Sequence, residues 1–283
     1  MSRICRVGPV EIGAGRPLTI IAGPCVLESL ELGLTVGKRA SELCRRLGFS
    51  YIFKASFDKA NRSSIRSARG PGIDQGLDWL STIRAELGCP VTTDIHERQQ
   101  AITAAGVVDL LQIPAFLCRQ TDLLVAAGEA AVRSRRAVNV KKGQFLAPHD
   151  MTGPLRKLTE TGCKDVLFTE RGTTFGYGRL INDFLGLGDL MQVKVSDEGA
   201  PPVCFDVTHS TQTPGLGGSE TTQGRPDRAP LLARAAVAAG AHALFIESHT
   251  DPSKAMSDAA TQIPLEQLEA LLEPCARIFD ALR

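Results

Sequence analysis

A cysteine at the tip of an apolar run is the first residue of the chain whose position suggests chemistry. The run that starts at Leu18 is broken by a Gly-Pro pair, and Cys25 follows the break, where a strand would end. His209 and Glu247 also stand at the ends of apolar runs, and Asp258 lies a short distance beyond the last of these runs. One sulfur, one imidazole and two carboxylates make a plausible site for a divalent metal ion.

No short spacing motif links these four residues, so only the fold could bring them together. The alternative interpretation is that Cys25 is a buried, inert side chain and that His209 has a structural role. The residues alone leave both interpretations open.

Cationic side chains follow several other apolar runs. The set comprises Lys54, Lys59, Arg62, Lys141, Lys142 and Arg171. With 32 Lys and Arg against 31 Asp and Glu, the net charge is only +1, which argues against nucleic acid or a membrane surface as a partner. Cations that converge in a near-neutral chain instead predict a small anionic ligand, and phosphate suits both guanidinium and ammonium groups. Solvated surface lysines are the alternative.

Short β-rich runs alternate with longer helical patterns along the whole chain. The expected strands are Leu18–Cys25, Tyr51–Ser56, Val91–Ile95, Leu110–Ala115, Ala137–Lys142, Val166–Arg171, Pro202–His209 and His242–His249. The expected helices are Leu30–Leu47, Gly76–Leu87, Glu97–Ala105, Asp122–Ala131, Pro226–Ala239 and Pro264–Leu282, with a weaker pattern at Gly178–Met191. This alternation predicts an α/β fold, a (β/α)8 TIM barrel that forms a single domain over residues 1–283.

A doubly wound open sheet is the competing architecture. Such sheets usually carry a G-x-G-x-x-G turn after an early strand, and the sequence has none there. Residues 1–16 precede the first strand, and the apolar pairs on either side of Gly8-Pro9 predict an N-terminal β-hairpin that caps the floor of the barrel.

Closure of a barrel places its eighth strand beside its first. Cys25, His209 and Glu247 would then come from three neighbouring strands, at the end where barrel enzymes keep their active sites. The two longest loops, Phe57–Gly72 and Ser210–Arg225, follow strands at the same end, and the glycine-rich second loop could close over a ligand.

The first residues of the chain and the distribution of its cysteines indicate the cellular location of the protein. No long apolar segment follows Met1, and no apolar run approaches the roughly 18 residues that span a bilayer. The eight cysteines are scattered without C-x-x-C pairs, which predicts reduced thiols and a cytoplasmic location.

Many separate stretches in one order resemble the 3-deoxy-D-manno-octulosonate 8-phosphate synthases, from about residue 18 to residue 265. They are FKASFDKANRSS (53–64), RGPG (69–72), TDIHE (93–97), QIPAFLCRQTDLL (112–124), NVKKGQF (139–145), FDVTH (205–209) and SDAATQIPL (257–265). The resemblance implies a barrel enzyme that condenses phosphoenolpyruvate with D-arabinose 5-phosphate and releases inorganic phosphate. It also implies a homotetramer and a product used in the inner core of lipopolysaccharide.

The alternative within this superfamily is a 3-deoxy-D-arabino-heptulosonate 7-phosphate synthase, which uses erythrose 4-phosphate. Those enzymes typically have K-P-R-T-S where this chain has K-A-N-R-S at residues 59–63. Asn61 stands directly before Arg62, as that proline stands before its arginine, and it favours arabinose 5-phosphate.

The resemblance also implies a role for each matching residue. Phosphoenolpyruvate would be bound by Lys54, Lys141, Gln144 and Arg171, with Lys59 also at that site, and the aldose phosphate by Asn61, Arg62 and Ser63. Asp94 would lie near the sugar, and Ser56 would also bind substrate. Arg62 would reach into the site of a neighbouring subunit. The residues implied in catalysis are Lys59, Asn61, His209 and Asp258.

Cys25 places the chain with the metal-dependent class of these synthases, because metal-independent members have asparagine at this position. The implied ligands of one divalent ion per subunit are Cys25, His209, Glu247 and Asp258. Fe²⁺, Zn²⁺, Mn²⁺, Co²⁺ and Cd²⁺ all suit mixed sulfur, nitrogen and oxygen ligation. Two rival functions are a Schiff-base aldolase that uses Lys54 or Lys141, and a sugar-phosphate-binding barrel without activity.

Overall fold

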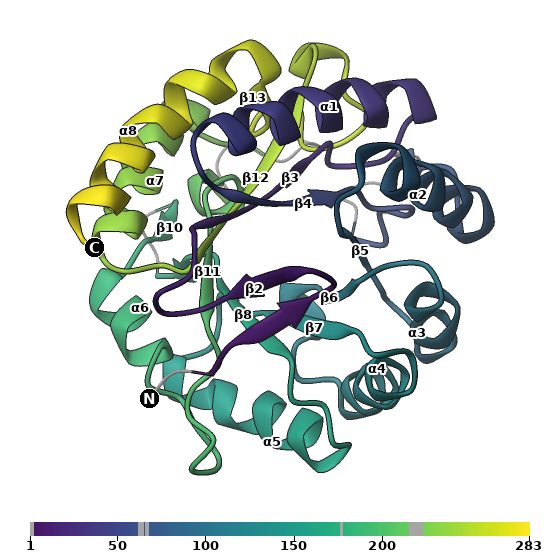
Figure 1. Cartoon of the computed structure of the whole chain (residues 1–283), viewed down its shortest axis with the longest axis vertical. Coiled ribbons are helices and arrows are strands. Elements are labelled where there is room, and N and C mark those ends of the chain that lie inside the picture. The colour runs from purple at the N-terminus through teal and green to yellow at the C-terminus, as the bar shows by residue number, and fades with distance from the viewer. Residues whose placement is uncertain (1–2, 62–64, 66–67, 176–177, 215–222) are drawn as a thin grey trace.

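Eight parallel strands close into a barrel in the computed structural model, which describes residues 3–61, 65, 68–175, 178–214 and 223–283 (Figure 1). The strands are β3 (Thr19–Gly23), β4 (Ser50–Lys54), β5 (Val91–Asp94), β6 (Leu110–Ile113), β7 (Ala137–Lys141), β8 (Val166–Glu170), β11 (Val203–Asp206) and β12 (Ala243–His249). Each pairs with the next, and β12 pairs with both β11 and β3, which closes the ring. The predicted (β/α)8 barrel is confirmed; its organisation as one domain stays a prediction.

Helices surround the barrel on its outer face (Figure 1). They are α1 (Leu30–Arg46), α2 (Ile73–Leu87), α3 (Arg98–Ala105), α4 (Thr121–Ser134), α5 (Thr152–Glu160), α6 (Phe184–Leu190), α7 (Ala229–Ala238) and α8 (Leu268–Ala281). The Ser29 side chain caps α1 by accepting from Leu32 N, and Val36, Ala40 and Leu43 of that helix face the core. Among the described residues, no helix has the length and apolar character needed to cross a bilayer.

The N-terminal hairpin plugs the floor of the barrel, as predicted. Strands β1 (Cys5–Val7) and β2 (Val10–Ile12) are antiparallel and lie across the centre of the ring in Figure 1. Cys5, Val7 and Ile12 are fully buried against the lowest inward-facing side chains of the barrel strands, such as Ile21 and Leu110. Because this end is sealed, a ligand must enter from the carboxyl ends of the strands.

Three short strands shape the loops at the open end. They are β9 (Thr173–Thr174), β10 (Leu180–Ile181) and β13 (Ile263–Pro264). β9 and β10 form a small hairpin after β8, and β13 adds to the end of β12 close to the loop that carries Asp258. These short strands hold the loop after β8 and the loop after β12 against the open end of the barrel.

His242 makes the stability of the fold depend on pH. Its Nδ1 accepts a hydrogen bond from Val203 N at 3.1 Å, so the folded state keeps the ring neutral. Burial lowers the pKa of His242 below its ordinary value of 6.5. The unfolded chain therefore binds this proton more readily, so the stabilisation is complete above about pH 6.5 and is lost as the pH falls below it. Thermal unfolding between about pH 7 and pH 5.5 should show a steeper loss for the wild type than for His242→Asn, and equal losses would contradict this account.

Candidate active site

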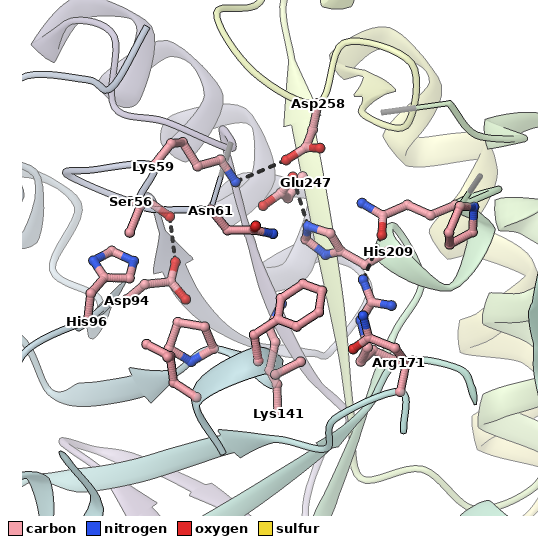
Figure 2. Close-up of a pocket in the computed structure, with 18 of the residues that line it drawn as sticks. Ser56, Lys59, Asn61, Asp94, His96, Lys141, Arg171, His209, Glu247 and Asp258 are labelled. Carbon is pink, nitrogen blue, oxygen red and sulfur yellow. Dashed lines mark hydrogen bonds and ion pairs between the residues drawn. The ribbon is translucent and has the colours of Figure 1, made fainter. Parts of the chain in front are cut away.

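A cavity of about 710 Å³ opens at the carboxyl ends of the barrel strands. Figure 2 shows side chains from strands on opposite sides of the ring pointing into it. The residues that line it include Lys54, Ser56, Lys59, Asn61, Asp94, Lys141, Gln144, Arg171, His209, Glu247 and Asp258. The volume lies within the usual range for small-molecule sites.

Three side chains of types that commonly bind metals meet at one side of this cavity, where Glu247 and Asp258 line it and Cys25 is buried next to them. The ligand atoms of Cys25, Glu247 and Asp258 all lie within 4.8 Å of one another, and Cys25 Sγ is 3.1 Å from Asp258 Oδ2. His209 stands beside this group, with its Nε2 3.7 Å from Glu247 Oε2. The structure therefore brings together all four residues that the sequence singled out, three of them as a compact group and His209 at its edge.

The chemistry of this group fits a cation. His209 Nδ1 lies 2.8 Å from Oδ2 of the buried Asp206, a carboxylate that can only accept, so Nδ1 carries the ring proton. In the neutral ring His209 Nε2 then presents a lone pair to Glu247 Oε2, which is buried and accepts no hydrogen bond from any described residue. Two facing electron-pair donors repel unless a positive charge lies near both, and the donor set suits a divalent metal ion.

Two lysines lie against the acidic side chains of the group. Lys54 Nζ is 2.5 Å from Glu247 Oε1, and Lys59 Nζ is 3.0 Å from Asp258 Oδ2. Burial alone would raise the pKa of Glu247, but the Lys54 ammonium holds it below its ordinary value. Burial and then Glu247 raise the pKa of the Cys25 thiol, so Cys25 requires a cation to become a thiolate ligand.

Local backbone contacts explain why this wall forms. A Cβ on Gly23 would lie 1.9 Å from the Lys54 carbonyl oxygen, so only glycine lets β3 approach β4 just before Cys25. Asp258 has φ +51°, a left-handed conformation uncommon outside glycine, which turns its loop toward the cavity. Gln262 joins the two segments, since it accepts from Cys25 N at 3.2 Å and donates to Ser257 O at 2.9 Å.

The opposite wall carries cationic and amide groups. Lys141 Nζ lies 2.7 Å from Asp206 Oδ2 and 3.4 Å from the centre of the Phe245 ring. Arg171 donates through Nη2 to Gln212 Oε1 at 2.7 Å, while its buried Nη1 has no partner among the residues described. A buried guanidinium nitrogen that lacks an acceptor beside a cavity indicates that the ligand is anionic.

Lys142 does not belong to this wall, and its expected convergence with the other cations is wrong. It is buried below the surface, where it donates to Leu146 O at 3.0 Å and to Thr173 Oγ1 at 3.3 Å, with Glu170 3.5 Å away. Neighbouring residues of a strand point to opposite faces, so Lys141 and Lys142 cannot both face the cavity. Lys142 thus braces the loops on which Gln144 stands.

The predicted aldose-binding residues lie on the third side of the cavity. Ser56 Oγ donates to Asp94 Oδ2 at 2.5 Å, and Asn61 lies nearby (Figure 2). Arg62 and Ser63 fall outside the residues that the structure describes, so their predicted contacts stay predictions.

Asp206 is the site residue whose role the sequence did not reveal. Its carboxylate is fully buried and accepts from Lys141 Nζ at 2.7 Å, from His209 Nδ1 at 2.8 Å and from His209 N at 2.9 Å. The Asp206 carboxylate therefore holds both Lys141 of the cationic wall and His209 beside the group of Cys25, Glu247 and Asp258. Its place at a strand end, three residues before a histidine, was the available signal.

Asp206→Asn is expected to disturb both walls while the fold survives. An amide cannot accept from both Lys141 and His209 with the strength of a carboxylate, and partners of metal-binding histidines typically contribute 10–100-fold in metal affinity or activity. We expect metal affinity to fall by about that factor, with a small change in the unfolding temperature. Unchanged metal affinity in equilibrium dialysis would show that Asp206 does not orient His209.

Comparisons with known proteins give one consistent family. The model of the DAHP synthetase I family matches residues 4–282. A protein of Synechococcus sp. named 2-dehydro-3-deoxyphosphooctonate aldolase is 50% identical over 96% of this chain and 92% of its own length. Proteins of the same name are 50% identical in Rhodopseudomonas palustris (97% and 92% covered) and 47% identical in Rickettsia bellii (96% and 95% covered).

Proposed function

The chain belongs to the DAHP synthetase I family, and we propose that it condenses phosphoenolpyruvate with D-arabinose 5-phosphate and water to give 3-deoxy-D-manno-octulosonate 8-phosphate and inorganic phosphate. The observation that carries this function is identity near 50%, over almost the whole chain, to proteins named for this aldolase reaction. The predicted resemblance and enzyme class are confirmed, and the erythrose 4-phosphate alternative is not favoured.

Lys141, Gln144 and Arg171 of the cationic wall are proposed to hold phosphoenolpyruvate together with Lys54 from the facing wall, with Ser56 at the edge of that subsite. Two phosphorylated anions repel strongly in a cavity that excludes water, so fixed positive charges are needed for both to bind. The unpartnered Arg171 Nη1 and the buried Gln144 Oε1, which has no partner among the residues described, support a polar ligand at this wall.

The aldose phosphate is proposed to bind across the cavity, with Asn61 and Asp94 at its hydroxyl groups and Arg62 and Ser63 at its phosphate. C3 of the enol attacks the aldehyde carbon of the open-chain sugar, and water adds at C2. Inorganic phosphate then leaves with cleavage of its C–O bond. Lys59, Asn61, His209 and Asp258 line the space where these atoms would meet, which supports their proposed catalytic role.

Cys25, His209, Glu247 and Asp258 are proposed to hold one divalent metal ion per subunit. Such an ion supplies Lewis-acid polarisation of an oxygen atom of the aldehyde or of water. Fe²⁺, Zn²⁺, Mn²⁺, Co²⁺ and Cd²⁺ are all compatible with the donor set. His209 must be neutral as a ligand, and the bond from its Nδ1 to Asp206 fixes the tautomer in which Nε2 faces the metal position; it would then be a poor general acid.

A comparison of the two aldoses tests the proposed reaction. Phosphate release from phosphoenolpyruvate should be rapid with arabinose 5-phosphate and at least about a hundredfold slower with erythrose 4-phosphate. Faster release with erythrose 4-phosphate would assign the chain to the heptulosonate branch of the family. Inactivation by borohydride in the presence of substrate would favour the lysine Schiff-base mechanism.

The assembly and the location of the protein are further proposals. We propose a homotetramer in the cytoplasm, in which Arg62 completes the site of a neighbouring subunit and the product serves lipopolysaccharide inner-core synthesis. The family resemblance of KANRSS at residues 59–64 and the free state of all eight cysteines support these proposals. Light scattering of the purified protein would measure the subunit number.

A further inference from the structure

A row of buried polar side chains crosses the barrel interior and ends at Asp94. Thr169 of β8 donates to Asn139 Oδ1 at 2.8 Å, Asn139 of β7 donates to Gln112 Oε1 at 2.9 Å, and Gln112 of β6 donates to Asp94 Oδ1 at 2.7 Å. All three donors are at most 1% exposed. Asp94, Gln112 and Asn139 are register partners on adjacent strands, so the barrel itself sets their spacing.

The charge at one end fixes the direction of every bond in the row. An ionised carboxylate can only accept, so Gln112 must turn its NH₂ group toward Asp94. Its carbonyl oxygen then faces Asn139, which must in turn present its own NH₂ group and accept from the Thr169 hydroxyl. Aligned hydrogen bonds of this kind polarise one another, and reversal of one amide would leave like groups facing on both sides.

The surroundings of Asp94 keep it in the accepting form. Burial alone would raise the pKa of Asp94, but Lys54 of β4 and Lys141 of β7 hold it below its ordinary value, with smaller help from His96 and from the Ser56 hydroxyl. Ser56 occupies Oδ2 (Figure 2) and Gln112 occupies Oδ1, so each oxygen is oriented by one protein donor. Each also keeps acceptor capacity beyond this bond, and Asp94 lines the cavity.

We propose that Gln112, Asn139 and Thr169 form a directional hydrogen-bond relay that holds the Asp94 carboxylate in one orientation, as a specificity-determining acceptor for the hydroxyl groups of the aldose phosphate. This inference rests on the proposed function. The relay residues are positioning residues, because none of the three has to touch the sugar. They act through Asp94, so their substitution should change the KM for the aldose phosphate and leave phosphoenolpyruvate binding unchanged.

The test uses near-isosteric substitutions in the full-length, metal-loaded enzyme. Gln112→Met, Asn139→Leu and Thr169→Val each break one link. We expect the KM for arabinose 5-phosphate to rise most for Gln112→Met, by about tenfold to a hundredfold, and progressively less for the two links farther from Asp94. The KM for phosphoenolpyruvate should change by less than about twofold. Thr92→Val is the matched control, because it removes a buried hydroxyl that donates to Leu110 O outside the relay.

A double-mutant cycle with Asp94→Asn separates positioning from a general loss of structure. If the relay acts through Asp94, Gln112→Met should add almost nothing to the loss already caused by Asp94→Asn. If the wild type turns over arabinose 5-phosphate, additive losses or equal increases of KM for both substrates would overturn the relay alone. A wild type without that turnover would overturn the proposed function and the relay together.

Discussion

Replacement of Cys25 with alanine is expected to remove the bound metal ion and the activity together. The cysteine is the soft ligand of the proposed set, and its sulfur lies 3.1 Å from Asp258 Oδ2. Loss even of groups that only orient a metal ligand typically costs 10–100-fold, so kcat should fall by more than about a hundredfold. Metal content, measured by elemental analysis after gel filtration, should fall in parallel.

Cys275→Ala provides a matched control for this prediction. Cys275 is an equally buried free cysteine, but it lies in α8 on the outside of the barrel. The control variant should keep its metal and its rate. A Cys25→Ala protein that is metal-free and fully active would contradict the proposed metal site, and Cys25 would then be a passive residue at a strand end.

Lys141→Met is expected to weaken productive binding of phosphoenolpyruvate strongly. The substitution removes a buried ammonium group from the anion-binding wall and leaves the Asp206 carboxylate without its ion pair. Hydrogen bonds to charged groups contribute about 1.5–3 kcal/mol, so kcat/KM for phosphoenolpyruvate should fall by about a hundredfold. Steady-state kinetics at saturating arabinose 5-phosphate measures this change.

Lys142→Met distinguishes a binding role from the loss of any buried lysine. Lys142 is equally buried, but it donates to Leu146 O and Thr173 Oγ1 away from the cavity. This variant should lose thermal stability with little change in the KM for phosphoenolpyruvate. If both variants raise that KM to the same extent, the two lysines act through structure, and the assignment of Lys141 to the substrate is wrong.

The barrel could be predicted because short apolar runs typical of buried strands alternate with helical patterns along the whole chain. The strands are short, largely apolar runs, several of which end in a polar residue, as at Lys54 and Lys141, and they are buried on both faces as parallel strands require. The two helices without a clear prediction are α5 and α6. The second has only 7 residues, two of them glycines with low helix propensity, and Asp183 has to cap it by accepting from Leu185 N.

The proposed metal ligands could be predicted because ring closure alone places β12 between β3 and β11. The contacts that orient those ligands could not be predicted from the sequence. Gln262 accepts from Cys25 N, 237 positions away, and Asp206 joins His209 to Lys141, 65 positions away, and no local pattern encodes such distances. The contact of Asp206 with His209 is local, but their spacing of three residues does not by itself reveal it. The relay behind Asp94 was equally hidden, because Asn139 and Thr169 look like ordinary polar interruptions of apolar strands.

Consumption of phosphoenolpyruvate with arabinose 5-phosphate, before and after treatment with a chelator and after return of single divalent metals, tests the central claim most directly. The account predicts turnover in the untreated protein, its loss after chelation and its recovery with at least one of the compatible ions. Turnover that persists after the metal has been removed would contradict the metal site while keeping the synthase. Absence of turnover under every condition would contradict the function itself.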